Sequence, residues 1–344
     1  MAIAELAARR RFRLREEDHV PPPGPGEVQV RVEAGGVCGS DLHYFLDGHI
    51  GDTPALYPQV LGHEPAGVVT AAGAGVSGWQ AGDRVALEPP VYCYHCEWCM
   101  SGRHNLCESV RFFSSPGEPG FFRRHANVPA ENLLALPPGL GFDEGSLFEP
   151  ISIILHSFRF GQPRMGETAA VLGAGPIGLS TVACLRLAGL KRIYSVEPVA
   201  ARRAMALRLG ADAAIDPREA DPVREILRET GGRGVDVAFD CATQDDTVNQ
   251  ALYMTAPGGR VVVTGVPQSA RVELDFHHLR RKELGFAGVR RANHTGAAAV
   301  QLLREHPEAF APMITHRMPL GEVQRAFEML GAYEDGAVKV VLRP

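Results

Sequence analysis

The sequence predicts an α/β protein with two domains, the first β-rich and the second built on a doubly wound parallel sheet. The length of 344 residues suggests about two domains. Short strand-like runs separated by turns rich in Gly and Pro fill the first part of the chain. From about Thr168 strands and helices alternate, which is the sequence pattern of a parallel sheet with crossover helices.

The predicted strands of the first domain are short. They cover 27–33, 66–71, 84–87 and 133–136. After Val289 the alternation stops, and the sequence predicts a helix near 295–305, another near 321–331 and a final strand in VKVVL. We expect this tail to return to the first domain, which would then span 1–150 and 290–344.

Six predicted strands with helices between them make up the second domain, over 151–289. Their ranges are 168–172, 192–197, 212–216, 235–240, 260–265 and 284–289. Six strands with intervening helices is the number expected for a doubly wound dinucleotide-binding fold.

Charge and composition exclude several classes of protein. The formal net charge of −5 gives no general attraction to nucleic acid or to anionic lipids, so we expect neither partner. No apolar run approaches the roughly 20 residues that span a bilayer. The basic run near the N-terminus follows a short apolar stretch, the reverse of a secretory signal. We therefore expect a soluble, cytoplasmic protein.

A glycine-rich turn, GAGPIG at Gly173–Gly178, lies between the first strand of the second domain and a helical segment. Gly173 permits the tight turn, Gly175 lets the backbone approach a pyrophosphate, and Gly178 allows the helix to pack close to the strand. The motif alone is weak in a chain with 38 glycines, and the alternative is a purely structural turn. Its place between a strand and a helix favours dinucleotide binding.

An acidic residue, Glu197, ends the next predicted strand, where it can accept hydrogen bonds from the adenosine ribose. A 2′-phosphate would lie against this carboxylate, so the sequence favours NAD over NADP. Arg202 and Arg203 keep the alternative open, because either could pair with a 2′-phosphate or form a solvated helix face.

Four of the seven cysteines crowd into one segment. Cys93, Cys96, Cys99 and Cys107 are separated by three, three and eight positions. Four thiolates fill a tetrahedral zinc shell and leave no position for a substrate, so the spacing predicts a structural zinc site. The alternative is a set of free or redox-active thiols. Cys184 and Cys241 are interpreted as core residues.

A second set of candidate ligands is dispersed: Cys38 in GGVCGSDLHYF, His63 and Glu64 in LGHEPAG, and Glu149 in LFEPISIILHS. Spacing alone does not unite them, because a lone Cys, His or Glu is usually structural or solvated. The combination of CGSDLH, LGHEPAGVV, GDRV, the four-cysteine segment, FEP and GAGPIG nevertheless resembles the zinc-containing medium-chain dehydrogenases over nearly the whole chain. CGSDLHYF, RFF, FEP and VRRAN resemble the sorbitol (polyol) dehydrogenase branch of that family.

The resemblance implies a GroES-like catalytic domain, a Rossmann domain and a catalytic zinc. Cys38, His63 and Glu64 would hold the ion and leave one position for water or a substrate hydroxyl. Glu149 stands where classical alcohol dehydrogenases carry a second cysteine ligand, and whether Glu64 or Glu149 ligates directly stays open. Ser40 and His43 would carry the released proton toward solvent.

The same resemblance assigns further residues to substrate and cofactor. Tyr44, Phe112 and Arg290 match positions that line the polyol pocket, but Arg291 replaces the aromatic residue common in that branch, which predicts a more basic pocket. The cofactor residues implied in addition to the three glycines and Glu197 are Pro176, Ile177, Arg202, Gly265 and Val266. His156 is interpreted as a packed or capped histidine.

We therefore expect an NAD-dependent oxidation of a secondary hydroxyl of a polyol, such as sorbitol or xylitol, to a ketose. The near alternatives are L-threonine, butanediol and L-idonate dehydrogenases. A different class of alternative is a non-catalytic protein that keeps the nucleotide fold and the structural zinc. The resemblance also suggests a homotetramer.

Overall fold

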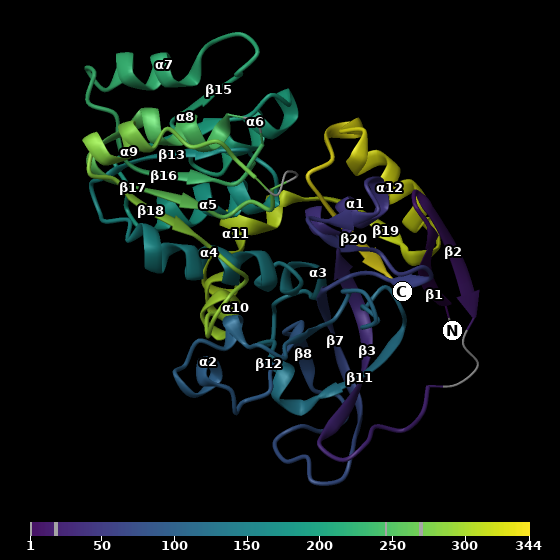
Figure 1. Cartoon of the computed structure of the whole chain (residues 1–344). Helices are drawn as coiled ribbons and strands as arrows, with labels where there is room; N and C mark the ends of the chain where they lie inside the picture. Colours follow the sequence, from purple (N-terminus) through teal and green to yellow (C-terminus); the bar gives the residue numbers. More distant parts are fainter. Residues whose placement is uncertain (1, 17–19, 245, 268–270) are drawn as a thin grey trace. The chain divides into compact units, whose positions relative to one another are not determined.

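The computed structural model describes residues 2–16, 20–244, 246–267 and 271–344 (Figure 1). It divides into two compact units: Met1–Glu149 with Gly296–Pro344, and Pro150–Thr295. The second boundary thus follows residue 295, whereas the sequence placed it after residue 289. The reason is local, since the buried Thr295 hydroxyl donates to the carbonyl oxygen of Ser152 at 2.7 Å and keeps this segment with the second unit.

The first unit is built on a sheet into which the end of the chain is inserted. The strand order is β12-β8-β7-β3-β20-β19, and β11 also pairs with β3. The strands are β3 (Glu27–Gly36), β7 (Glu64–Ala72), β8 (Arg84–Leu87), β11 (His125–Pro129), β12 (Leu133–Ala135), β19 (Ile314–Pro319) and β20 (Lys339–Arg343). The C-terminal strand β20 therefore lies directly beside β3, and both chain ends belong to this unit (Figure 1).

Smaller elements complete the first unit. Its short strands are β1 (Ala2–Ala8), β2 (Arg11–Glu16), β4 (His49–Ile50), β5 (Thr53–Pro54), β6 (Gln59–Val60), β9 (Pro90–Val91) and β10 (Arg111–Phe112). Its helices are α1 (Gly39–Leu46), α2 (Glu97–Met100), α3 (Phe142–Gly145), α10 (Gly296–Glu305), α11 (Pro307–Phe310) and α12 (Val323–Gly331).

Helix α1 is held in place by an aromatic cluster. Phe45 packs against Phe327 of α12 with ring centroids 5.3 Å apart, and Phe12 lies 4.7 Å from Phe327. These side chains belong to a buried apolar core that also contains Tyr44. Because close-packed cores tolerate little movement, this cluster fixes the helix and thereby Cys38, which directly precedes it.

The second unit contains a six-stranded parallel sheet in the order β15-β14-β13-β16-β17-β18. Its strands are β13 (Thr168–Leu172), β14 (Arg192–Val196), β15 (Ala213–Ile215), β16 (Val235–Asp240), β17 (Thr255–Val263) and β18 (Gly285–Gly288). Its helices are α5 (Pro176–Leu187), α6 (Ala200–Arg208), α7 (Pro222–Glu229), α8 (Thr247–Met254) and α9 (Phe276–Arg281), preceded by α4 (Phe148–Gly161). The sheet grows outward from β13 in both directions, which confirms the predicted doubly wound fold.

Two glycines allow α5 to start tightly against β13. Gly173 has a φ of +87°, in the left-handed region that favours glycine. A Cβ on Gly178 would come within 1.8 Å of the Gly173 carbonyl oxygen, so the helix could not approach the strand this closely with any other residue. Among the described residues, none of the helices is both long and apolar enough to cross a membrane.

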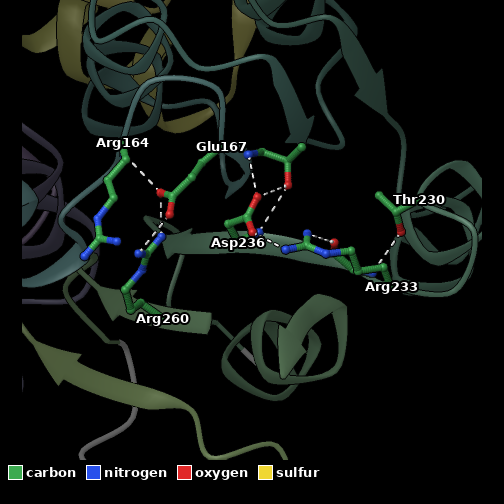
Figure 2. A network of polar contacts seen from close by, with 8 residues as sticks. Arg164, Glu167, Thr230, Arg233, Asp236 and Arg260 are labelled. Atoms are coloured by element: carbon green, nitrogen blue, oxygen red, sulfur yellow. Dashed lines mark hydrogen bonds and ion pairs between the residues drawn. The ribbon is translucent and has the colours of Figure 1, made fainter. Parts of the chain in front are cut away.

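A polar network joins three neighbouring strands of the second unit, β13, β16 and β17, near the amino ends of β13 and β16 (Figure 2). The Asp236 carboxylate accepts hydrogen bonds from the backbone N–H and the hydroxyl of Thr168, both at 2.8 Å, and pairs with Arg233 at 2.5 Å. Glu167 pairs with Arg260 at 2.6 Å. Since ligands of such sheets bind at the carboxyl ends of the strands, this network lies at the opposite edge and stabilises the fold.

Replacing Asp236 with Asn should therefore lower stability by about 1–3 kcal/mol without changing the affinity for nucleotide. Burial alone would raise the pKa of Asp236, but Arg233 and Thr168 outweigh it and lower the pKa. The stabilisation is present above the ordinary carboxyl pKa of about 4 and is lost as the pH falls through the lowered pKa. Chemical denaturation at several pH values should show the largest difference from the wild type near neutrality.

The matched control is Glu225→Gln, which removes an exposed ion pair with Arg228 on α7 and should cost less than about 1 kcal/mol. A difference between wild type and Asp236→Asn that stays constant down to pH 3 would contradict this account of the network.

Candidate metal centres and nucleotide site

Cys38, His63 and Glu64 meet at the starts of two elements of the first unit, α1 and β7. Cys38 directly precedes α1, and His63 and Glu64 stand at the start of β7. One ligand atom from each side chain lies within 4.8 Å of the others. A thiol, an imidazole and a carboxylate at this separation form a donor set that suits zinc.

The Asp41 carboxylate, a residue without a predicted role, orients this group. Asp41 is 1% exposed. One of its oxygens, Oδ1, lies 3.3 Å from Nδ1 of His63, and the other accepts a hydrogen bond from the Cys38 N–H at 3.2 Å. The remaining ring nitrogen, Nε2, is therefore the one that His63 can offer to a metal, as in the carboxylate–histidine–zinc arrangement. An acid three residues after a helix-capping residue is a recognisable capping signal that could have identified Asp41.

The protonation of His63 is linked to this carboxylate. Burial alone would lower the pKa of His63, but the Asp41 carboxylate and the Cys38 thiol outweigh it and raise the pKa well above its ordinary value. A metal ion must therefore displace a proton from the ring, so metal binding is coupled to pH.

A buried lysine pairs with Glu64. Lys339, on β20, is completely buried, and its ammonium group donates to Oε2 of Glu64 and to the carbonyl oxygen of Val37, the latter at 3.1 Å. Burial would lower the pKa of Lys339, but Glu64 and Cys38 raise it, which keeps the ammonium charged. The signal in the sequence is a lone lysine within the apolar strand VKVVL.

The second oxygen of Glu64 is left for a cation. Oε1 of Glu64 is buried and has no hydrogen-bond partner in the part of the chain that the structure describes. Burying a carboxylate oxygen without a partner raises the free energy of the folded state, unless a ligand binds that oxygen. Gly36, opposite Glu64 on β3, provides the room, because a Cβ there would come within 2.0 Å of Oε2. These observations fit a metal ion beside Cys38, His63 and Glu64.

Glu149 lies near this group but outside the set of mutually close ligand atoms. It is buried at the start of α4. Burial raises its pKa to about 7, with Glu64 and Asp41 acting in the same direction and His63 and Lys339 against it. A bound dication would favour the ionised form.

The other predicted catalytic and substrate residues occupy different places. Phe112 lies with its ring centroid 5.5 Å from that of His63, and the Ser40 hydroxyl is 3.4 Å from His63 Nε2. Nδ1 of His43 pairs with Asp47 at 3.1 Å. Tyr44 is buried in the apolar core beside α1.

Arg290 does not belong to this unit. It is exposed after β18 in the second unit, and Arg291 beside it has a left-handed φ of 58°.

The four-cysteine segment forms a second candidate metal centre. The sulfur atoms of Cys93, Cys96, Cys99 and Cys107 lie within 4.8 Å of one another. The backbone N–H of Cys93 donates to the sulfur of Cys107, and the backbone N–H of Cys96 donates to the sulfur of Cys93, both at 3.4 Å. Hydrogen bonds from the backbone of Cys99 and Glu108 lower the pKa of Cys96 to about 6, which favours the thiolate that metals require.

The glycine-rich turn of the second unit leaves a free approach to its backbone. Gly175 caps α5 and Pro176 begins it, with Ile177 following. A Cβ on Gly175 would meet no atom within 4 Å. Glu197, just after β14, is buried and braces the turn, since its oxygens accept hydrogen bonds from the N–H groups of Ala174 at 2.7 Å and Val199 at 2.9 Å.

The arginines near Glu197 are already engaged. Arg203 pairs with the buried Asp216 at 2.9 Å and donates to the Glu197 carbonyl oxygen, also at 2.9 Å. Arg202 is half-buried on α6. At the carboxyl end of β17, Val266 is exposed, and a Cβ on Gly265 would come within 2.4 Å of the Thr243 hydroxyl.

Both units match known protein families. The alcohol dehydrogenase GroES-like domain matches residues 24–138, and the zinc-binding dehydrogenase domain matches residues 176–305. Sorbitol dehydrogenase of Bacillus subtilis (strain 168) is 33% identical over 325 residues, covering 94% of this chain and 92% of the relative. The chain belongs to the zinc-dependent alcohol dehydrogenase family.

Other members of this family are equally similar. L-idonate 5-dehydrogenase of Vitis vinifera is 34% identical over 328 residues, covering 94% of this chain and 89% of the relative. A candidate zinc-binding dehydrogenase of Sinorhizobium meliloti 1021, solved bound to NADP, superposes with a TM-score of 0.91 at 32% identity and covers 100% of this chain and 99% of that one.

Membership in the alcohol dehydrogenase family confirms the resemblance and the GroES-like and Rossmann fold read from the sequence. It also makes the protein an enzyme, so the alternative of a non-catalytic nucleotide-binding zinc protein is set aside.

Replacing Lys339 with Met should make the protein more dependent on zinc. The substitution leaves the Glu64 carboxylate buried without its cation, a loss of about 3–5 kcal/mol for a buried pair. Zinc beside Glu64 would restore a positive charge there. Calorimetric scans of zinc-loaded and chelator-stripped protein should therefore show a larger rise in Tm with zinc for Lys339→Met than for the wild type.

Lys191→Met, which changes an exposed lysine of the second unit, is the control and should respond to zinc as the wild type does. An equal zinc-induced rise in Tm for Lys339→Met and the wild type would contradict the role given to Lys339.

Proposed function

We propose that the protein oxidises a secondary hydroxyl of a polyol, such as sorbitol or xylitol, to a ketose and transfers the hydride to NAD. The observation that carries this proposal is the Oε1 of Glu64, which has no hydrogen-bond partner among the described residues, beside Cys38 and the oriented imidazole of His63. A set of donors preorganised in this way suits a catalytic zinc, and the glycine-rich turn before α5 suits a dinucleotide.

Each group around the proposed catalytic zinc has a definite task. When bound, zinc supplies the Lewis acidity that makes a substrate hydroxyl easier to deprotonate. Asp41 keeps the proton of His63 on Nδ1, and Lys339 holds one oxygen of Glu64 away from the ligand position. Phe112 places an apolar ring next to His63.

Ser40 and His43 carry the released proton away in this proposal. The two residues are three positions apart on α1 and therefore share a face of the helix. The Ser40 hydroxyl lies 3.4 Å from Nε2 of His63, the nitrogen proposed to bind the metal, and His43 is held by Asp47. The imidazole of histidine is the side chain best suited to pass a proton near neutral pH.

A polyol is favoured over the other substrates of the family by the motifs CGSDLHYF, RFF, FEP and VRRAN. Tyr44, Phe112 and Arg290 are the residues proposed to bind it. L-threonine, butanediol and L-idonate remain the near alternatives, and the relative from Vitis vinifera is named for L-idonate. The same resemblance favours a homotetramer.

The direct test is a steady-state screen of polyols, L-threonine, butanediol and L-idonate with NAD and NADP, before and after chelation. We expect the highest kcat/KM for a polyol with NAD, about two zinc ions per chain, and loss of turnover on chelation. Activity on L-threonine alone, or full activity after complete removal of zinc, would overturn the proposal.

NAD is proposed over NADP because the Glu197 carboxylate stands after β14, where it would repel a 2′-phosphate. Arg203, which could have offset that repulsion, is paired with Asp216. The NADP in the structure from Sinorhizobium meliloti 1021 belongs to that protein and makes NADP the alternative to test.

Replacing Glu197 with Gln should shift the preference toward NADP by about tenfold or more in the ratio of kcat/KM values, equivalent to about 1.4 kcal/mol. The ratio is the correct readout because glutamine cannot accept both backbone hydrogen bonds, a loss that affects both cofactors. The control is Glu219→Gln, which makes the same change from a carboxylate to an amide at an exposed position of the same unit. An unchanged ratio in Glu197→Gln would show that this carboxylate does not select the cofactor.

A further inference from the structure

Ser114 adopts a backbone conformation that serine rarely takes. It is 3% exposed and has a φ of 78°, in the left-handed region that favours glycine. Its backbone is fixed on both sides, because its N–H donates to the Glu118 carbonyl oxygen at 3.0 Å and its carbonyl oxygen accepts from the Gln59 side chain at 2.8 Å. Glycine would take this conformation with less strain, so the feature that serine adds is its hydroxyl.

That hydroxyl points at the carboxylate that orients His63. The Ser114 hydroxyl donates to Oδ1 of Asp41 at 2.9 Å, across 73 positions of the chain. The same oxygen lies 3.3 Å from Nδ1 of His63 and accepts from the Gly62 N–H at 3.3 Å. The bond from Ser114 is thus the shortest of the contacts to this oxygen.

Three chain segments meet at the Asp41 carboxylate. They are α1, the segment before β7 that contains Gly62 and His63, and the turn after β10 that contains Ser114. If the hydroxyl were lost, the Asp41 carboxylate would be freer to rotate, and the contact with Nδ1 of His63 would lose its fixed direction. The effect would reach Nε2, the nitrogen proposed to face the metal.

We propose that Ser114 is a positioning residue of the metal centre, which acts through Asp41 to fix the orientation of His63. The proposal rests on the metal-binding role proposed above for His63. Partners of metal ligands typically change metal affinity by 10-fold to 100-fold when they are removed. Since Ser114 acts one step further from the ion, we expect an effect near the lower end of this range.

The experiment compares the release of zinc to a chelator from the full-length, zinc-loaded protein and its variants. The variants are Ser114→Gly, Ser114→Ala and the control Ser115→Ala, and a coloured zinc indicator follows the release. Loss of a release phase in His63→Ala identifies the phase that belongs to the catalytic site. The remaining phase, assigned to the four-cysteine site, serves as an internal control.

The expected result is an approximately tenfold faster release from the catalytic site in Ser114→Gly and Ser114→Ala, with the four-cysteine phase and Ser115→Ala unchanged. Ser114→Gly should also keep a higher Tm than Ser114→Ala, because both variants lose the hydroxyl and only glycine relieves the backbone strain at a φ of 78°. This combination separates positioning from a general structural role, which would lower the Tm and accelerate both phases together.

Two results would overturn the proposal. Release from the catalytic site at the wild-type rate in Ser114→Gly, or equal acceleration of both phases with a lower Tm, would show that Ser114 only shapes its turn and would leave the proposed function intact. If the wild type held no zinc that His63→Ala removes, the proposed function would fail as well.

Discussion

The first unit buries several acidic groups in one place, and this constraint governs how the segments around them are arranged. Asp41, Glu64 and Glu149 are all nearly inaccessible to solvent. Buried charges are tolerated only when opposite charges and hydrogen bonds meet them. Lys339 provides one such charge, His63 lies against Asp41, and a divalent cation would satisfy the remaining oxygen of Glu64.

This requirement gives the C-terminal strand a role in the site. The ammonium group of Lys339 reaches Glu64 because β20 lies beside β3, and β3 pairs with β7, which begins at Glu64. Gly36 at that register leaves room for the carboxylate. The sheet order and the electrostatics of the metal centre therefore depend on each other, although Lys339 and Glu64 are 275 positions apart in sequence.

Local patterns made much of this predictable from the sequence. The six parallel strands of the second unit appear close to their predicted ranges because each is an apolar run bounded by turn residues, and β17 differs by beginning at Thr255, before the predicted 260. The four cysteines could be grouped because they lie within one short segment. The three glycines of the turn could be recognised because a strand and a helix flank them.

Contacts between residues far apart in the sequence could not be predicted from such local patterns. Asp41 and Lys339 carry local signals, a capping pattern and a lone lysine in an apolar strand, whereas Ser114 carries none. None of these signals identifies the distant partner, so the link of each residue to His63 or Glu64 appears only in the folded chain. The grouping of Cys38 with His63 and Glu64 likewise needed the family resemblance, because Cys38 lies far from the other two residues in sequence. Glu197 was visible at the end of its strand, but its hydrogen bonds to the backbone of the glycine-rich turn were not.

The most direct measurement of the central claim is anomalous diffraction at the zinc absorption edge from crystals of the metal-loaded protein. We expect one peak enclosed by the four cysteines and a second within ligand distance of Cys38 Sγ, His63 Nε2 and Glu64 Oε1. A peak at the four cysteines alone, with the His63 imidazole and the Glu64 carboxylate turned away from Cys38, would contradict the account.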